Sequence, residues 1–191
     1  MPGQWSVRVA AAADAEAIAS IYAHYVEHSS ATFEEEPPSA TEIALRMAAI
    51  ERAGHPFLVA EEPGRIGGYA YCTSHRPRSA YRFTLEDSVY VDRELAGRGL
   101  GTILLEALVE AAARAGARRL VAVIADDGEP ASVALHERCG FTHAGRLRRV
   151  GYKHGRWLDT VLMQRDVGDQ PRGAGACAPT SASVARSAAG S

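Results

Sequence analysis

The chain has 191 residues, 47% of them hydrophobic and 23% charged, with a net charge of −2 at neutral pH. These values predict one soluble globular domain with a substantial core. The charge gives no reason to expect nucleic acid or an anionic membrane as a partner, and no apolar run reaches the roughly 18 residues of a membrane span. The first ten residues lack the apolar core of a signal peptide. Three scattered cysteines, Cys72, Cys139 and Cys177, predict reduced thiols in the cytoplasm rather than a disulfide framework.

The first half of the chain predicts a strand, two helices and a hairpin. Residues 5–10 alternate as a strand does, and residues 14–30 carry apolar side chains at helical spacing. After a loop that ends in two prolines, Ser39 and Glu42 form a capping box for a second helix. Residues 56–74 then contain two β-rich runs around a Pro-Gly-Arg turn, which is typical of a hairpin.

The second half predicts alternating strands and helices. The expected elements are a strand over 85–91, a helix over 100–115, a strand over 118–126, a short helix between Pro130 and Gly140, and strands over 142–152 and 157–167. The nearly continuous apolar run of 118–126 suits a central strand covered on both faces. The order β-α-α-β-β-β-α-β-α-β-β predicts a mixed α/β domain with helices flanking a central sheet.

The end of the chain differs in composition. From Gly168 onward the sequence is rich in Gly, Ala, Ser, Pro and Thr without an apolar period. Such a segment cannot bury enough surface to offset its ordering entropy. We therefore expect a folded domain over 5–166 and a disordered Gly/Ala/Ser-rich tail over 167–191.

A glycine-rich loop, GRGLGT at 97–102, lies at a strand-to-helix junction. Backbone amides can approach a phosphate closely where side chains are absent, and a helix N-terminus favours negative charge. The dinucleotide fingerprint would need a glycine where Thr102 stands, and a P-loop would need Gly-Lys-Ser/Thr. An ordinary glycine-bearing turn and a pyrophosphate cradle of another design both remain open.

Several separated motifs resemble one enzyme family. VYV at 89–91, GRGLG and ASVALHERCGF resemble the acetyl-CoA-binding core of the GNAT superfamily of N-acetyltransferases. The match is closest to the phosphinothricin acetyltransferases, which acetylate the α-amine of phosphinothricin and methionine sulfoximine. The supporting segments are FEEEP (33–37), RSAYRFTLEDSVYV (78–91), VAVI (121–124), SVALHE (132–137) and GYKHGRWLD (151–159). The resemblance covers roughly residues 5 to 166.

The resemblance implies a fold, a reaction and partners. The expected fold is a GNAT-type central mixed, mostly antiparallel sheet flanked by helices. Acetyl-CoA would be the co-substrate, with no metal, and a small amino acid would be acetylated by direct transfer. The family also suggests a homodimer, with FEEEP near the shared site.

Two side chains are implied as catalytic, Glu86 and His136. Acetyl transfer needs a neutral amine, so a general base must take a proton from the ammonium. Glu86 matches the family's catalytic glutamate, and His136 matches a histidine thought to assist as its partner. Side chains alternate along a strand, so Asp87 should point to the opposite face and serve structure.

The remaining implied site residues hold the two substrates. The cofactor-binding set is Val89, Tyr90, Val91, Gly97, Arg98, Gly99, Leu100, Gly101, Thr102 and Ser132, and the substrate-binding set is Phe33, Arg78, Tyr81 and Ser88. An amide of the strand near Val89 would polarise the thioester oxygen. Ala96 and Glu129 depart from the family pattern, which has Gln or Arg and commonly Asn there.

Three other interpretations remain open. The enzyme could acetylate another small amine or a peptide N-terminus, or the chain could be a CoA-binding sensor whose catalysis has decayed. HYVEH at 24–28 also fits an inverted zinc-protease signature, with His24 and His28 on one helical face. No downstream glutamate is evidently placed as a third zinc ligand, so we expect no metal there.

Overall fold

The computed structural model describes residues 5–126, 128 and 130–168, which form one layered sheet with helices on it. The sheet has the strand order β1-β2-β3-β4-β5-β7-β6. Its strands are β1 (Ser6–Val9), β2 (Phe57–Glu62), β3 (Arg65–Ser74), β4 (Thr84–Val91), β5 (Arg119–Asp126), β6 (Thr142–Lys153) and β7 (Arg156–Asp166). Neighbouring strands are antiparallel except β4 and β5, which are parallel. The predicted fold class is confirmed.

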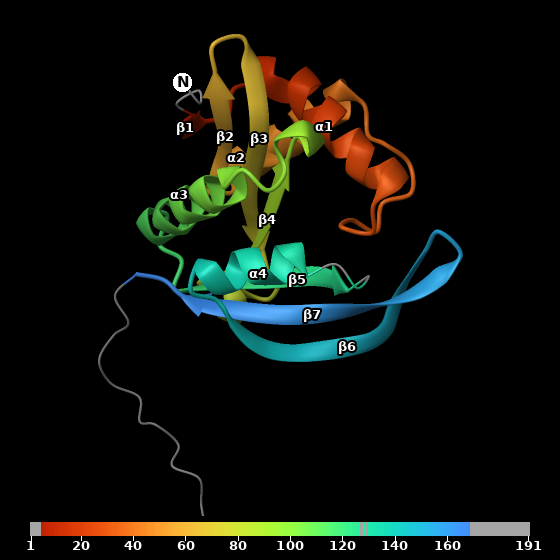
Figure 1. The fold of residues 1–191 in the computed structure, drawn as a ribbon. Coiled ribbons are helices and arrows are strands. Elements are labelled where there is room, and N and C mark those ends of the chain that lie inside the picture. The colour runs from red at the N-terminus through yellow and green to blue at the C-terminus, as the bar shows by residue number, and fades with distance from the viewer. Residues whose placement is uncertain (1–4, 127, 129, 169–191) are drawn as a thin grey trace, which may run out of the picture.

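Helices cover both faces of the first four strands (Figure 1). They are α1 (Ala15–His28), α2 (Ala40–Arg52), α3 (Leu100–Arg114) and α4 (Ala131–Arg138), with short 3-10 turns η1 (Ala12–Asp14), η2 (Ser79–Tyr81) and η3 (Arg93–Leu95). The alternation of β2 separates two cores: Phe57 and Val59 pack with α1 and α2, whereas Leu58 and Ala60 pack with α3. The predicted element order is confirmed, with element ends shifted by one or two residues.

The capping box predicted for α2 forms only in half. The Ser39 hydroxyl accepts the backbone N–H of Glu42 at 3.2 Å. The Glu42 carboxylate turns instead to Arg46, whose Nε donates to it at 3.2 Å. The side-chain cap of the helix start is therefore as predicted, and the reciprocal contact is replaced by an i,i+4 ion pair.

Strand β5 corrects one prediction. Leu120, Ala122 and Ile124 are buried, but Val123 is 40% exposed. The strand is thus covered on one face and not on both. The reason is tertiary: α1 and α2 pack over β2, β3 and β4, and their cover ends before β5.

The C-terminal boundary lies one residue later than expected. Val167 is only 4% exposed, and its N–H donates to the Arg118 carbonyl at 3.0 Å. Val167 therefore belongs to the core rather than to a tail that begins at 167. Residues 169–191 lie outside the described residues. None of the helices within the described ranges is long and apolar enough to cross a membrane.

Candidate active site

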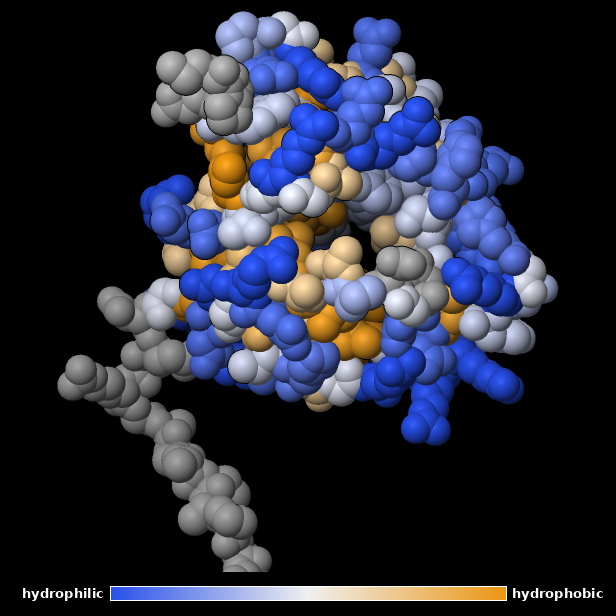
Figure 2. Space-filling model, viewed as in Figure 1, coloured by the Kyte–Doolittle hydropathy of each residue, from blue (hydrophilic) through white to orange (hydrophobic). Residues whose placement is uncertain are grey.

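The sheet opens between β4 and β5. Their parallel pairing runs from Thr84 with Arg119 to Asp87 with Ala122 and stops there, although both strands continue. In Figure 1 the two halves of the sheet diverge from this point. Figure 2 shows the surface hollowed between the half with β1 to β4 and the half with β5 to β7, and hydrophobic residues border the hollow. The free edge of β4 therefore lines an opening.

The backbone of Val89 faces this opening. The Tyr25 hydroxyl donates to the Val91 carbonyl at 2.6 Å, on the side of β4 away from β3. Backbone groups two residues apart point to the same edge of a strand, so those of Val89 do as well. Asp87 pairs with β5 and Val91 is closed by Tyr25. Val89, between them, presents an amide donor where a thioester oxygen could be polarised.

The glycine-rich loop joins η3 to α3 and takes a backbone path that favours glycine. Gly97 has φ 75° and Gly99, the N-cap of α3, has φ 84°, both in the left-handed region. The N–H groups of Thr102 and Ile103 both bond to the Gly99 carbonyl. The amides before them lie at the helix N-terminus, where an anion is stabilised. This geometry fits a pyrophosphate.

Gly101 belongs to this motif for a different reason. A Cβ at this position would lie 3.2 Å from Leu135 Cδ2 of α4. Glycine therefore eases the close approach of α3 to α4. The expected part of Gly101 in binding the co-substrate stays a prediction. A Cβ at Gly99 meets nothing within 4 Å, so its constraint is the backbone conformation.

Glu86 lies on the face of β4 that carries α1 and α2. Its Oε2 is 3.3 Å from Nδ1 of His75, and the two side chains are 36% and 20% exposed. The ring of His75 makes an edge contact with Tyr81 at 6.0 Å between centroids. Glu86 therefore combines a partly exposed carboxylate with a neighbouring imidazole, an arrangement able to accept a proton from a bound amine.

His136 does not pair with Glu86 as expected. Its Nε2 lies 2.9 Å from Asp87 Oδ2, and the side chains of His136 and Asp87 are 5% and 1% exposed. Its Nδ1 lies 2.7 Å from the Ser132 carbonyl, which can only accept, so Nδ1 carries a proton. The alternation of β4 explains the pairing, because Asp87 points to the face opposite Glu86, as predicted.

The environment of His136 favours its charged form. Burial by itself lowers the pKa of His136. The hydrogen bond and charge of Asp87, together with the Ser132 carbonyl, outweigh burial and raise the pKa above its ordinary value. His136 and Asp87 therefore form a buried ion pair that ties α4 to β4 beside the end of the β4–β5 ladder.

The predicted substrate residues lie on three segments. Ser88 is on β4, where it is the cross-strand partner of Tyr71 on β3. Arg78 is exposed at the N-cap of η2, and Tyr81, at the end of η2, is 44% exposed. Phe33, 40% exposed, lies in the loop between α1 and α2. The ring contact with His75 therefore brings Tyr81 close to Glu86. Phe33 lies on a different segment, the loop between α1 and α2.

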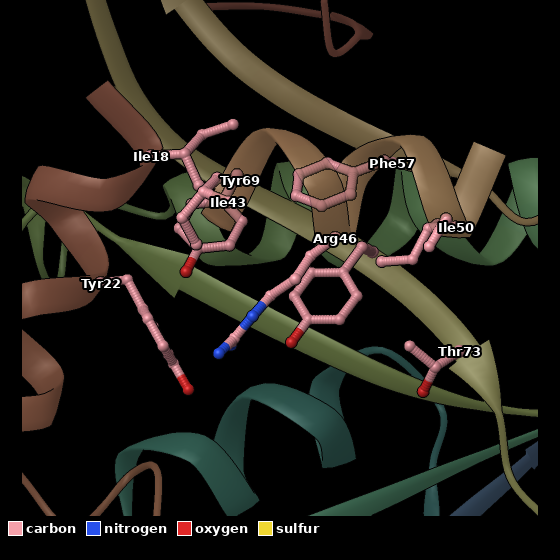
Figure 3. Close-up of a pocket in the computed structure, with 10 residues that line it drawn as sticks. Ile18, Tyr22, Ile43, Arg46, Ile50, Phe57, Tyr69 and Thr73 are labelled. Carbon is pink, nitrogen blue, oxygen red and sulfur yellow. The ribbon is translucent and has the colours of Figure 1, made fainter. Parts of the chain in front are cut away.

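A cavity of about 280 Å³ lies on the Glu86 face of the sheet. In Figure 3 the polar ends of Tyr22 and Arg46 point away from the aliphatic side chains of Ile18 and Ile43. The lining residues are Ile18, Tyr22, Ile43, Arg46, Ala49, Ile50, Phe57, Tyr69, Tyr71 and Thr73. Thr73 is the cross-strand partner of Glu86, so the cavity adjoins the carboxylate.

Sequence reasoning missed the contact of His75 with Glu86. Thr73 pairs with Glu86 and Ser74 with Leu85, so His75 follows β3 directly beside the start of β4. This register depends on the β3–β4 pairing. The sequence itself offered only a histidine in a loop after a predicted strand.

The alternative zinc motif gains no support from the structure. The rings of His24 and His28 stack on each other, with their centroids 5.1 Å apart. Among the described residues no cluster of three or more His, Cys, Asp or Glu could hold a metal ion.

The opened sheet, the positive-φ glycine loop before α3 and the carboxylate on β4 fit an acyl-CoA-dependent transferase. The acetyltransferase (GNAT) domain model matches residues 7–162, and the chain belongs to this family. It is an N-acetyltransferase that uses acetyl-CoA as co-substrate. The residues that fit acetyl-CoA are the open β4 edge at Val89 and the loop around Gly97 and Gly99.

Relatives at high identity refine the comparison. The chain is 52% identical over 160 residues to a phosphinothricin N-acetyltransferase of Alcaligenes faecalis, covering 84% of this chain and 81% of the relative. It is 41% identical to an L-methionine sulfoximine/L-methionine sulfone acetyltransferase of Pseudomonas aeruginosa, covering 83% and 92%. A phosphinothricin acetyltransferase of Sinorhizobium meliloti, crystallised with acetyl-CoA, superposes with a TM-score of 0.82 at 45% identity, covering 86% and 89%.

Proposed function

We propose that the enzyme acetylates the α-amine of a phosphinothricin-like or methionine-sulfoximine-like amino acid by direct transfer. The observation that carries this proposal is the partly exposed Glu86 carboxylate, 36% exposed, beside the opening of β4 and β5. The named activities of the relatives supply the substrate class.

In this reaction Glu86 accepts a proton from the substrate ammonium, directly or through a water. The freed amine nitrogen attacks the thioester carbon and the new C–N bond forms. The C–S bond breaks with its electrons on the departing sulfur, and the proton that the nitrogen loses as the amide forms is taken up by that sulfur, so the products are the amide and the CoA thiol. The Val89 amide donates to the carbonyl oxygen as negative charge develops there. His136 contributes as a positioning residue, because both ring nitrogens are engaged by Asp87 and Ser132.

Four side chains would recognise the amino acid. The Arg78 guanidinium suits a carboxylate or a phosphinate, since its planar fork binds such oxygens well. Ser88 lies two positions along β4 from Glu86, Tyr81 contacts the ring of His75, and Phe33 would supply an aromatic wall. The cavity beside Thr73 offers an apolar space for the substrate side chain. The co-substrate would be held by the residues of 97–102 and by the start of α4 at Ser132.

A substrate panel tests the proposal. Release of free CoA thiol would be measured with methionine sulfoximine, phosphinothricin, proteinogenic amino acids, simple amines and short peptides. We expect the highest kcat/KM with the first two. Preference for amines without a carboxylate or for peptides would support the alternative substrate classes. Acetyl-CoA binding without turnover of any acceptor would support the decayed sensor.

We also propose that the enzyme is a cytoplasmic homodimer joined through β6. This strand is an edge of the sheet, and Leu147 and Val150 on it are 46% and 51% exposed. Tyr152 and Trp157, 55% and 60% exposed, contact each other at the end of the same hairpin, with ring centroids 5.3 Å apart. Exposed edges and apolar patches of this kind are usually covered. Sedimentation velocity should give a dimer, and a monomer at micromolar concentration would contradict the interface.

The buried free thiols of Cys72 and Cys139 support the proposed cytoplasmic location, because free thiols are typical of a reducing compartment.

A further inference from the structure

Lys153 is the single lysine among the 21 basic residues of the chain. It ends β6 and is only 2% exposed, one of the largest fully buried side chains. Lysine is rarely buried unless its charge is compensated, because removing an ammonium from water is costly. A chain that otherwise uses arginine has thus kept its one lysine in the interior.

The contacts of Lys153 explain the residue type. Nζ donates to the carbonyl oxygens of Ser29 and Thr32, each at 2.8 Å, and to that of Tyr25 at 3.4 Å. These carbonyls belong to the last turn of α1 and the loop after it, where the helix dipole favours a cation. A compact ammonium with three donors fits three converging carbonyls, whereas the planar guanidinium of arginine does not.

The same hairpin supports Phe33. A Cβ at Gly151 of β6 would lie 2.4 Å from the Phe33 ring, so the ring rests directly on the Gly151 backbone. Arg156, at the start of β7, donates to the Ser30 hydroxyl at 3.3 Å. The end of the β6–β7 hairpin therefore holds the loop 29–34 at both its backbone and its aromatic side chain.

We propose that Lys153 is a positioning residue for the amino-acid substrate. Its ammonium fixes the loop 29–34, and this places Phe33 as a wall of the acceptor site. The hairpin thereby sets the KM for the amino acid without contacting it. The inference rests on the proposed function only in assigning Phe33 to the acceptor site.

The first test follows the loop and needs no substrate. Lys153→Met keeps an unbranched chain but removes the donors. Amide hydrogen exchange over 29–34 should accelerate in this variant, whereas Arg114→Met, which removes an exposed cation on α3, should leave it unchanged. Unchanged exchange in Lys153→Met would overturn the proposal.

The second test is a double-mutant cycle with Phe33→Ala. We expect Lys153→Met to raise the KM for methionine sulfoximine about tenfold, with kcat and the KM for acetyl-CoA nearly unchanged. In the Phe33→Ala background, Lys153→Met should add little. Fully additive effects would show that Lys153 does not act through Phe33. A wild-type enzyme inactive on every amino acid, with accelerated exchange in Lys153→Met, would reject the proposed function and retain the loop contact.

Two further measurements apply if Lys153→Met does not fold. Gly151→Ala displaces the Phe33 ring while keeping Lys153, so it should raise the same KM in the wild-type background and not in Phe33→Ala. Reductive methylation of native enzyme should leave the single lysine unmodified. Rapid methylation of Lys153, or a Gly151→Ala effect independent of Phe33, would overturn the proposal.

Discussion

Two carboxylate–histidine pairs on neighbouring residues of β4 make an instructive comparison. Glu86 and His75 are 36% and 20% exposed and 3.3 Å apart. Asp87 and His136 are 1% and 5% exposed and 2.9 Å apart. The alternation of the strand sends the two carboxylates to opposite faces, and solvent access then separates their roles. We propose that the open pair exchanges protons with a substrate and that the closed pair holds α4 against β4.

The largest expected effect breaks the open pair. Glu86→Gln should lower kcat/KM at neutral pH by about 10²–10⁴-fold, because a general base contributes that much. The free energy of unfolding of this variant and its affinity for acetyl-CoA should stay near the wild-type values. Steady-state thiol release measures the rate, with Glu110→Gln, exposed on α3, as a control that should behave like wild type.

The next effect breaks the closed pair. Asp87→Asn leaves the charge of His136 buried without its partner, and losing one member of such a pair costs about 3–5 kcal/mol of folding free energy. Urea unfolding measures this loss. A variant as stable as wild type would mean that the pair contributes no net stability. It would contradict the structural role assigned to the buried pair.

The pH dependence of the closed pair sharpens the comparison. The folded state raises the pKa of His136 above 6.5, so it retains a proton that the unfolded state has already released. Stability from the pair is therefore complete below pH 6.5 and is lost as pH rises through the folded pKa. The stability gap between wild type and His136→Gln should be wider at about pH 6 than at about pH 9. A gap that widens with pH would contradict the assigned charge.

The smallest expected effect concerns the imidazole of the open pair. A partly exposed carboxylate–imidazole contact is worth at most about 1 kcal/mol, so His75→Gln should lower kcat/KM by no more than about fivefold. Kinetics of His75→Gln and of the exposed His143→Gln would be compared. A loss as large as that of Glu86→Gln would place His75 itself in the proton transfer.

Local features of the fold were predictable because periodicity and glycine and proline positions mark single elements. The positions of Glu86 and Asp87 on opposite faces followed from strand alternation alone. The partner of His136 did not, because Asp87 lies 49 residues away in sequence and the contact depends on how α4 packs on β4. The exposed face of β5 likewise could not be predicted, because it depends on how far across the sheet α1 and α2 pack. Lys153 left a signal in the composition, a single lysine, but its carbonyl partners come from a distant loop.

The pH–rate profile of kcat/KM with methionine sulfoximine, for wild type and Glu86→Gln, tests the central claim most directly. If Glu86 is the base, the deficit of the variant should be largest at low pH and shrink as pH rises, because solvent then supplies the neutral amine. A variant within about threefold of wild type at every pH, far below the effect of losing a general base, would exclude Glu86 from that role.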